Sequence, residues 1–391
     1  MATLEQSQGL LFSVQNALKI TSKLRTYSMV LALALIWVAF QMATDGAFLQ
    51  SRNLSNLFRQ MAGTGTLAVG MVLIIVAGHI DLSVGSVACF VGAVLAVLEA
   101  NHNWGAWPAF AAALVTGATI GLIQGWLTSY QRIPAFIVTL GGMMIFRGAS
   151  MWLTEGNTIP LPENWILTLG SGYLSSSLSW GLTAVAIAVA SWSLIRNRRM
   201  LQKYELESAG SLPMLIAKVL GIALGLSAIM TVFALYEGIP YPVLVMGLFL
   251  LIFHFLATRT IFGRHVYAIG GNLEAAGLSG IRVKSRTLIV FVLMGTLAAI
   301  AGLIFTTRVG SASPDAGQLT ELDAIASCVI GGTSLMGGRG SVMGALLGAL
   351  IMESLNNGMS MANMDSFWQY IVKGSVLVVA VWADSVSRAQ K

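Results

Sequence analysis

The stretch TLIVFVLMGTLAAIAGLIFT (Thr287–Thr306) is a run of twenty residues without a charged side chain. The hydrocarbon core of a bilayer is about 30 Å thick, and an α-helix crosses it in about 20 residues. Inside such a core every backbone polar group needs a partner within the protein, and an α-helix supplies these partners itself. The stretch therefore predicts a helix that spans a membrane.

Runs of the same kind recur along the chain, and the same criterion predicts twelve membrane segments. Two places are less regular: Ile80-Asp81 separates two of the runs, and a short apolar piece ends before Gly337. We therefore expect one all-α domain over residues 1–391, a polytopic bundle of transmembrane helices. The expected segments are 27–44, 61–79, 82–100, 108–130, 134–154, 177–195, 213–235, 240–258, 287–306, 322–336, 341–357 and 367–384.

The composition of the whole chain agrees with this class. Of its 391 residues, 56% are hydrophobic and 10% are charged, whereas soluble domains carry about 25% charged residues. The net charge of +6 does not indicate a nucleic-acid partner, because the cations lie in short loops and form no basic face with aromatic residues. Cys89 and Cys328 lie in apolar runs and read as buried thiols, so no metal site is predicted.

The Lys and Arg residues set the expected orientation, because short cytoplasmic loops are enriched in cations. With the N-terminus inside and twelve segments, seventeen of the 22 cations fall on the cytoplasmic side. Arg147 and Lys373 lie within segments, and three cations fall outside. Both termini are therefore expected in the cytoplasm. The cytoplasmic parts are the N-terminal segment 1–26, the basic loop 196–212 and the loop 259–286.

The loop 259–286 contains the local signals of a short helix over 272–280. Asn272 is a suitable N-cap, Glu274 lies in the first turn where the helix dipole favours an anion, and Gly280 suits a left-handed C-terminal stop. The residues between them are mostly small. Such a helix fits a groove on a partner protein, but it equally fits the surface of its own bundle.

Ionisable residues at membrane depth are expensive, which makes them candidates for function. Asp81 and the nearby Ser83 precede an apolar run, so Asp81 either caps the next helix or lines a translocation path. Arg147 is expected to lie close enough to Glu321 and Asp323 for an ion pair. Glu353 and Lys373, on the last two segments, are expected to pair likewise. A proton relay is the functional alternative to these structural pairs.

Three ladders of glycines at four-residue spacing mark helix faces that can approach another helix closely. Each ladder fits either packing within one subunit or an interface between two copies. The ladders are Gly117-Gly121-Gly125, Gly221-Gly225 and Gly344-Gly348.

The loop around Gly271–Ile281 resembles the cytoplasmic coupling loop of sugar importers of the ATP-binding-cassette class, in the ribose/xylose permease group. The shared core is G-N-x-x-A-A-x-x-S-G-I. The resemblance covers the chain almost end to end. Its other motifs are IDLSVGS (80–86), AFIVTL (135–140) with Arg147-Gly148, ELDAIA (321–326), GGTSLMGG (331–338), LNNGM (355–359) and QYIVKG (369–374).

The resemblance implies a homodimeric permease in the inner membrane of a bacterium. It implies a cytoplasmic ATPase partner that uses ATP and magnesium, a periplasmic binding protein that delivers a monosaccharide, and no cofactor on this chain. The long middle, 164–239, resembles xylose-type rather than ribose-type permeases, which favours D-xylose. The residues to which the resemblance assigns coupling to the ATPase are Gly271, Asn272, Glu274, Ala275, Ala276, Ser279 and Gly280.

Two other classes compete with this interpretation. One is a secondary transporter driven by protons or sodium through its intramembrane acids, and the other is an intramembrane enzyme. The chain has no Gly-x-x-x-x-Gly-Lys-Ser/Thr motif, the loop that cradles nucleotide phosphates, and no paired catalytic residues are apparent. The glycine-rich run Gly331–Gly340 instead predicts a break between two helical pieces. The candidate residues of a translocation path are Asp81, Ser83, Arg147, Glu321 and Asp323.

Overall fold

The computed structural model describes residues 27–204 and 211–389 of the chain. The predicted segment 1–26 and the central part of the basic loop 196–212 lie outside the described residues.

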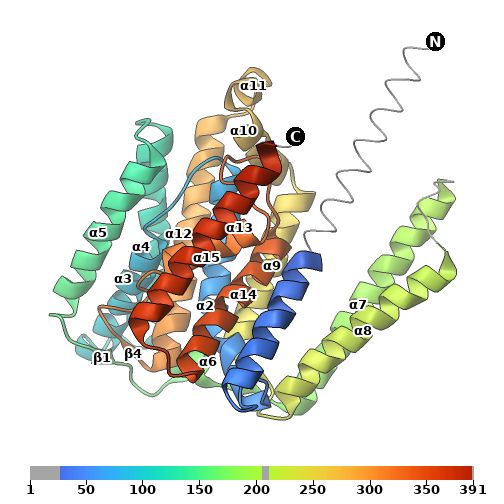
Figure 1. The fold of residues 1–391 in the computed structure, drawn as a ribbon. Helices are drawn as coiled ribbons and strands as arrows, with labels where there is room; N and C mark the ends of the chain where they lie inside the picture. Colours follow the sequence, from blue (N-terminus) through green and yellow to red (C-terminus); the bar gives the residue numbers. More distant parts are fainter. Residues whose placement is uncertain (1–26, 205–210, 390–391) are drawn as a thin grey trace.

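The chain forms a bundle of α-helices, as predicted (Figure 1). Eight helices are long and apolar enough to cross a membrane, and two shorter apolar helices, Tyr27–Ala43 and Ser366–Trp382 within α15, flank them in sequence. The eight helical stretches are α2 (Ser51–Val76), α3 with its π-helical end η1 (Val84–Asn101), α4 (Ala106–Ser129), α5 (Ala135–Leu153), α7 (Ser176–Lys203), α8 (Leu212–Ala234), α9 (Tyr241–Arg259) and α12 (Val283–Val309).

The helix α2 forms the centre of the bundle and is buried over nearly its whole length. It contacts α12, α14 (Val342–Met361), α9 and α13 (Thr320–Ile330). The expected start at residue 61 is wrong, since α2 begins ten residues earlier at Ser51. Its first turns carry Arg52, Asn53 and Gln60, polar residues that an apolar-run criterion excludes but that protein neighbours accommodate.

Two of the predicted segments are broken, at the places where the sequence is least regular. After α2 the chain continues without helix through residues 77–83 before α3 begins at Val84. Residues 331–341 are likewise non-helical between α13 and α14. The prediction of a helical break in the glycine-rich run is therefore confirmed. Irregular backbone of this kind persists at membrane depth only where protein or water covers it.

Two of the three glycine ladders pack inside this chain. A Cβ on Gly117, Gly121 or Gly125 of α4 would overlap atoms of α12, including the Phe291 carbonyl oxygen. Gly344 and Gly348 of α14 meet the backbone of α13 and Gly331 in the same way. By contrast, Gly221 and Gly225 of α8 have no heavy atom of another element within 4 Å of an added Cβ.

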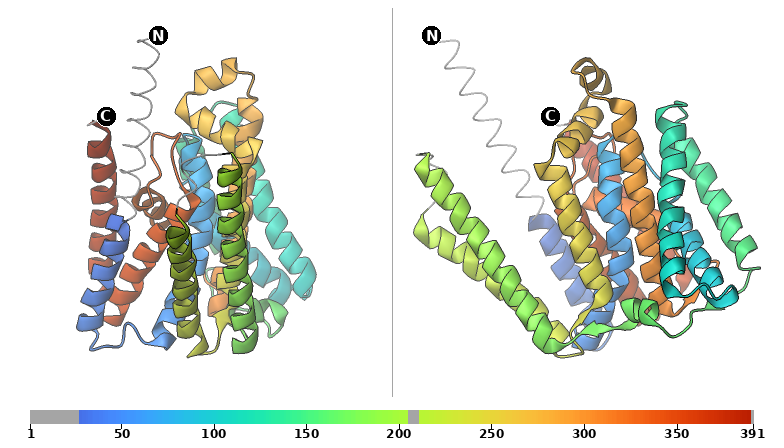
Figure 2. Two further views of the ribbon diagram at one scale, coloured as in Figure 1. Left: turned by 90° about the vertical axis from the view of Figure 1, so that its right-hand side faces the viewer. Right: turned by 180° about the vertical axis from the view of Figure 1, so that it is seen from behind.

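The two ends of the bundle differ in construction. At one end lie the short helices α10 (Ile261–Gly271) and α11 (Leu273–Leu278), the α4–α5 turn and the last turns of α15 (Figure 1). At the other end lie α6 (Trp165–Ser171) and two short antiparallel strand pairs. These pairs are β1 (Ile159–Pro160) with β4 (Ser311–Ala312), and β2 (Tyr173–Leu174) with β3 (Ile239–Pro240). The α7–α8 hairpin leans away from the body from this end (Figure 2).

Candidate functional site

The short helix predicted in the loop 259–286 is present as α11. Its N-cap Asn272 accepts a hydrogen bond at Oδ1 from the Ala275 amide at 2.9 Å. Glu274 lies in the first turn, and the Ser279 hydroxyl donates to the Ala275 carbonyl at 2.8 Å. Gly280 follows with a φ of +81°, a conformation that disfavours residues with a side chain. The cap and stop thus form as the sequence predicts.

The faces of α11 differ in what they contact. Ala276 is buried against the chain itself, whereas Ala275 is exposed. Leu273 and Leu278 are 60% and 85% exposed. Sequence reasoning treated the two alanines alike, and only the structure separates a supporting residue from an accessible one. The helix therefore presents small and apolar side chains outward at the end of the bundle (Figure 1).

Behind α11, three backbone segments meet through glycines. A Cβ on Gly270 of α10 would overlap the carbonyl oxygen of Val76, the last residue of α2. That oxygen accepts a hydrogen bond from the Gly338 amide at 2.9 Å. Thus α10 contacts the end of α2 and the 331–341 break at one point, which we name the glycine junction (Gly270, Val76 and Gly338).

Tyr267 adds a side-chain link between α10 and the same break. Its hydroxyl donates to the Gly340 carbonyl at 2.8 Å. Burial raises the pKa of Tyr267 above its ordinary value, so the phenol keeps its proton at neutral pH and remains a donor. Sequence reasoning missed Tyr267, because its partner lies 73 residues away.

Asp81 and Ser83 lie together where the first broken segment meets α3. Asp81 Oδ1 accepts from the Ser83 amide at 2.8 Å and from the Ser83 hydroxyl at 2.7 Å. The Gln124 side chain on α4 donates to Ser83 Oγ at 2.9 Å. Asp81 therefore fixes the turn that leads into α3, without bonding an amide inside the helix. Gln124 was missed, since nothing nearby in sequence marks it.

Arg147 does not pair with a carboxylate as expected. Its guanidinium donates to the carbonyls of Pro314 at 2.9 Å and Ala316 at 3.0 Å, and thereby holds the loop before α13 against α5. Glu321 is buried beside Gly85 of α3, where an added Cβ would overlap its Oε2. The expectation of an ion pair to Glu321 or Asp323 is wrong because loop carbonyls satisfy the guanidinium first.

The expected Glu353–Lys373 pair is also wrong. Lys373 of α15 instead lies 3.1 Å from Asp323 Oδ2. The Asn356 amide lies 3.3 Å from the same oxygen and 3.5 Å from Glu353 Oε2, so it bridges the two acids. The i, i+3 spacing of Tyr370 and Lys373 was a usable signal for one shared face of α15, but it does not reveal which acid faces it.

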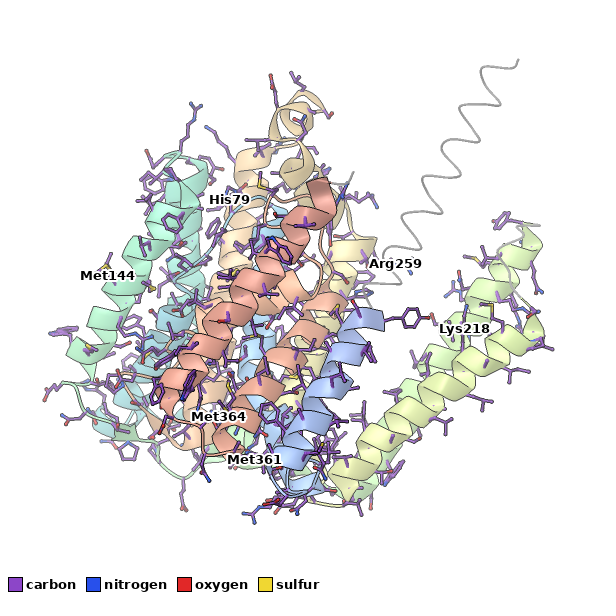
Figure 3. All side chains as sticks on the ribbon, viewed as in Figure 1. His79, Met144, Lys218, Arg259, Met361 and Met364 are labelled. Atoms are coloured by element: carbon purple, nitrogen blue, oxygen red, sulfur yellow. The ribbon has the colours of Figure 1, made fainter. Side chains whose placement is uncertain are left out.

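The Asp323–Lys373 pair borders a cavity of about 330 Å³ between α13, α14 and α15. A second cavity of about 490 Å³ lies at the end of the bundle opposite α11, near Met361 (Figure 3). It is lined by polar residues of α2, among them Arg52, Asn53 and Arg59, and by Tyr173 and Tyr236. The chain thus has polar openings at two levels.

Nothing in the described residues indicates a metal centre. No group of three or more His, Cys, Asp or Glu side chains comes together there. Cys89 and Cys328 are free and buried, as the sequence predicted.

A helical bundle with this many membrane-length apolar helices, buried charges and broken segments is a polytopic membrane protein. The chain belongs to the branched-chain amino acid transport system / permease component family, whose family model matches residues 53–381. No solved structure matches the chain.

Three relatives cover nearly the full length. The chain is 47% identical over 369 residues to the xylose transport system permease protein XylH of Escherichia coli (strain K12), which is 93% of each chain. It is 46% identical to the XylH protein of Haemophilus influenzae, over 93% of this chain and 97% of the relative. The ribose import permease protein RbsC of Escherichia coli (strain K12) is 35% identical, over 90% and 91% of the two chains.

Proposed function

We propose that this chain is the membrane-spanning permease subunit of an ATP-driven importer of a monosaccharide, D-xylose. The observation that carries the proposal is the 47% identity to a xylose transport system permease over 93% of both chains. The lower identity to the ribose import permease, 35%, favours xylose over ribose. The chain itself acts as a transporter subunit rather than as an enzyme.

The proposed setting is the inner membrane of a bacterium, with twelve membrane segments and both termini in the cytoplasm. The eight long helices, the two shorter apolar ones and the two broken segments support this count. The cation-rich loop 259–286 lies at the same end as the last turns of α15, which supports one cytoplasmic end. Two copies of the chain form the permease, with no nucleic acid involved.

The proposed partners are a cytoplasmic ATPase and a periplasmic sugar-binding protein. The ATPase binds ATP and magnesium, while this chain binds no cofactor. The exposed Leu278 and Ala275 of α11 support docking into a groove of the ATPase. Gly271, Asn272, Glu274, Ser279 and Gly280 shape the helix, and Ala276 seats it on the chain.

The proposed mechanism is alternating access. Movement of the ATPase displaces α11, and the glycine junction carries that displacement to the end of α2 and to the 331–341 break. Asp81, Ser83, Arg147 and Glu321 hold the broken segments in place. Sugar then crosses along a path of weak contacts, because tight binding would slow release.

The test is uptake of labelled sugar by vesicles that contain the full-length chain, its ATPase and its binding protein. We expect ATP-dependent uptake of D-xylose that exceeds uptake of ribose and arabinose. Uptake by this chain alone, driven by a proton gradient, would overturn the proposal in favour of a secondary transporter.

A variant of α11 sharpens the test. Ala275→Arg should lower co-purification of the ATPase and sugar uptake together, by about tenfold or more, because docking would bury an unpaired charge. Thr258→Arg, an exposed residue near the end of α9, is the matched control and should leave both near wild type. If Ala275→Arg retains both, α11 is not the coupling element.

A further inference from the structure

The cavity between α13, α14 and α15 combines apolar walls with polar groups that are only partly used. Its volume of about 330 Å³ lies at the small end of the range for ligand sites, about 300–1,000 Å³. Leu322 and Met352 line its apolar side. Asp323 and Lys373 form its charged side, with side chains 6% and 22% exposed.

Several polar atoms at this cavity have bonding capacity left. Lys373 has three donors, of which one reaches Asp323. In the described part of the chain, the bonds to the Asp323 carboxylate both reach Oδ2, which leaves Oδ1 open. The Gln318 amide and the Tyr370 hydroxyl also line the cavity and have no protein partner among the described residues. Donors and acceptors therefore alternate around a small space.

This pattern matches neighbouring hydroxyl groups. Each hydroxyl both donates and accepts a hydrogen bond, so a pair of adjacent hydroxyls can donate to a carboxylate and accept from an ammonium group at once. The apolar walls fit the C–H face of a compact ring, and the Tyr370 ring, on the same face of α15, offers a flat surface. A simple alcohol would leave several of the polar groups unsatisfied.

The charges exclude an ionic ligand. Asp323 and Lys373 neutralise each other at 3.1 Å, so an anion or a cation in the cavity would remain unpaired in a medium of low polarity, at high cost. Leu319, at the edge of the cavity, has a φ of 61°, a strained conformation for a residue with a side chain, and such strain often marks functional sites.

We infer that this cavity is a transient contact site for a small neutral polyol, a monosaccharide, with Asp323, Lys373, Tyr370 and Gln318 as the hydrogen-bonding residues. The inference rests on the proposed function and assigns its substrate to particular side chains. Lys373, Tyr370 and Gln318 become specificity-determining residues, while Asp323 also anchors α15 to α13.

The direct test uses the full-length chain in lipid nanodiscs, without partners. Leu322→Cys places a thiol in the cavity, while the native Cys89 and Cys328 are buried. We expect D-xylose to slow alkylation of this thiol by a small maleimide, and equimolar sodium acetate to leave the rate unchanged. An alkylation rate that D-xylose does not change overturns the inference.

Uptake by the whole complex supplies the second readout. Tyr370→Phe should lower D-xylose uptake by about two- to tenfold, the range of one neutral hydrogen bond, and change the ratio of xylose to ribose uptake. Tyr204→Phe, an exposed tyrosine at the end of α7, is the matched control and should change neither.

The charge pair needs its own control, because removal of one member leaves the other unpaired. The double variant Asp323→Asn with Lys373→Met removes both charges and should assemble like wild type, while uptake falls about tenfold or more. Wild-type uptake and selectivity in the double variant would overturn the inference. Protection by xylose without ATP-driven uptake would sink the proposed function but keep the site. ATP-driven uptake without protection would do the reverse.

Discussion

The α4–α12 contact and the α7–α8 hairpin carry the same sequence feature with opposite results. Gly121 of α4 lies so close to α12 that a Cβ would overlap the Phe291 carbonyl oxygen. Gly225 of α8 has no heavy atom of another element within 4 Å of an added Cβ. Most of α12 is buried, whereas the buried residues of α8 are Met230 and Phe233.

The difference shows what glycine spacing does and does not specify. Four-residue spacing puts small residues on one helix face and permits close approach. It does not say whether a partner helix is present. In a bilayer the exposed ladder costs little, because lipid tails cover it as well as protein does. The hairpin is attached mainly at its base, by the β2–β3 pair and by Phe233, whose ring lies 5.4 Å from that of Phe58.

The largest expected effect comes from filling the packed ladder. Gly121→Val should force α4 away from α12 and destabilise the bundle, at the upper end of about 1–3 kcal/mol for an overpacked core. Thermal stability in detergent and yield of folded protein measure this effect. Gly225→Val is the matched control and should behave like wild type. Equal losses in both variants would contradict the distinction between packed and open ladders.

An intermediate effect is expected at the glycine junction. Gly270→Ala should push α10 off the Val76 carbonyl and lower sugar uptake about tenfold, since strain of about 1–3 kcal/mol falls on the proposed coupling route. The adjacent Gly271→Ala should be tolerated, because a Cβ there meets nothing within 4 Å. Uptake by reconstituted vesicles measures both variants. Comparable uptake in the two would remove the junction from the mechanism.

The smallest effect is expected from removal of the hairpin. Leu174 pairs with Ile239, so residues 175–238 can be replaced by Asn-Gly, a turn that suits a two-residue hairpin. We expect folded yield and uptake to change by no more than about threefold, since the main loss is the Phe58–Phe233 contact, worth about 0.5–1.5 kcal/mol. Failure of the shortened chain to fold would show that the hairpin supports the body.

The features that depend on local chemistry were predictable from the sequence. Apolar runs predicted the helices, because their lengths match a bilayer. Asn272 and Gly280 predicted the limits of α11, because a cap and a left-handed stop need only neighbouring residues. The glycine-rich run predicted the 331–341 break for the same reason. The motifs that resemble sugar permeases are likewise visible without a fold.

The features that depend on residues distant in sequence were decided only by the tertiary structure. The sequence offered Glu321 and Asp323 to Arg147, and Glu353 to Lys373, yet Arg147 bonds loop carbonyls and Lys373 pairs with Asp323. A carboxylate's charge identifies it as a possible partner, but the packing of helices determines which one is within reach. The same holds for Gln124 and Tyr267, whose partners come from other elements. The sequence by itself determined a membrane helix bundle and its coupling loop, because hydrophobicity and capping act locally. The ion pairs, the cavity and the fate of each glycine ladder required the fold, because they depend on which helices are neighbours.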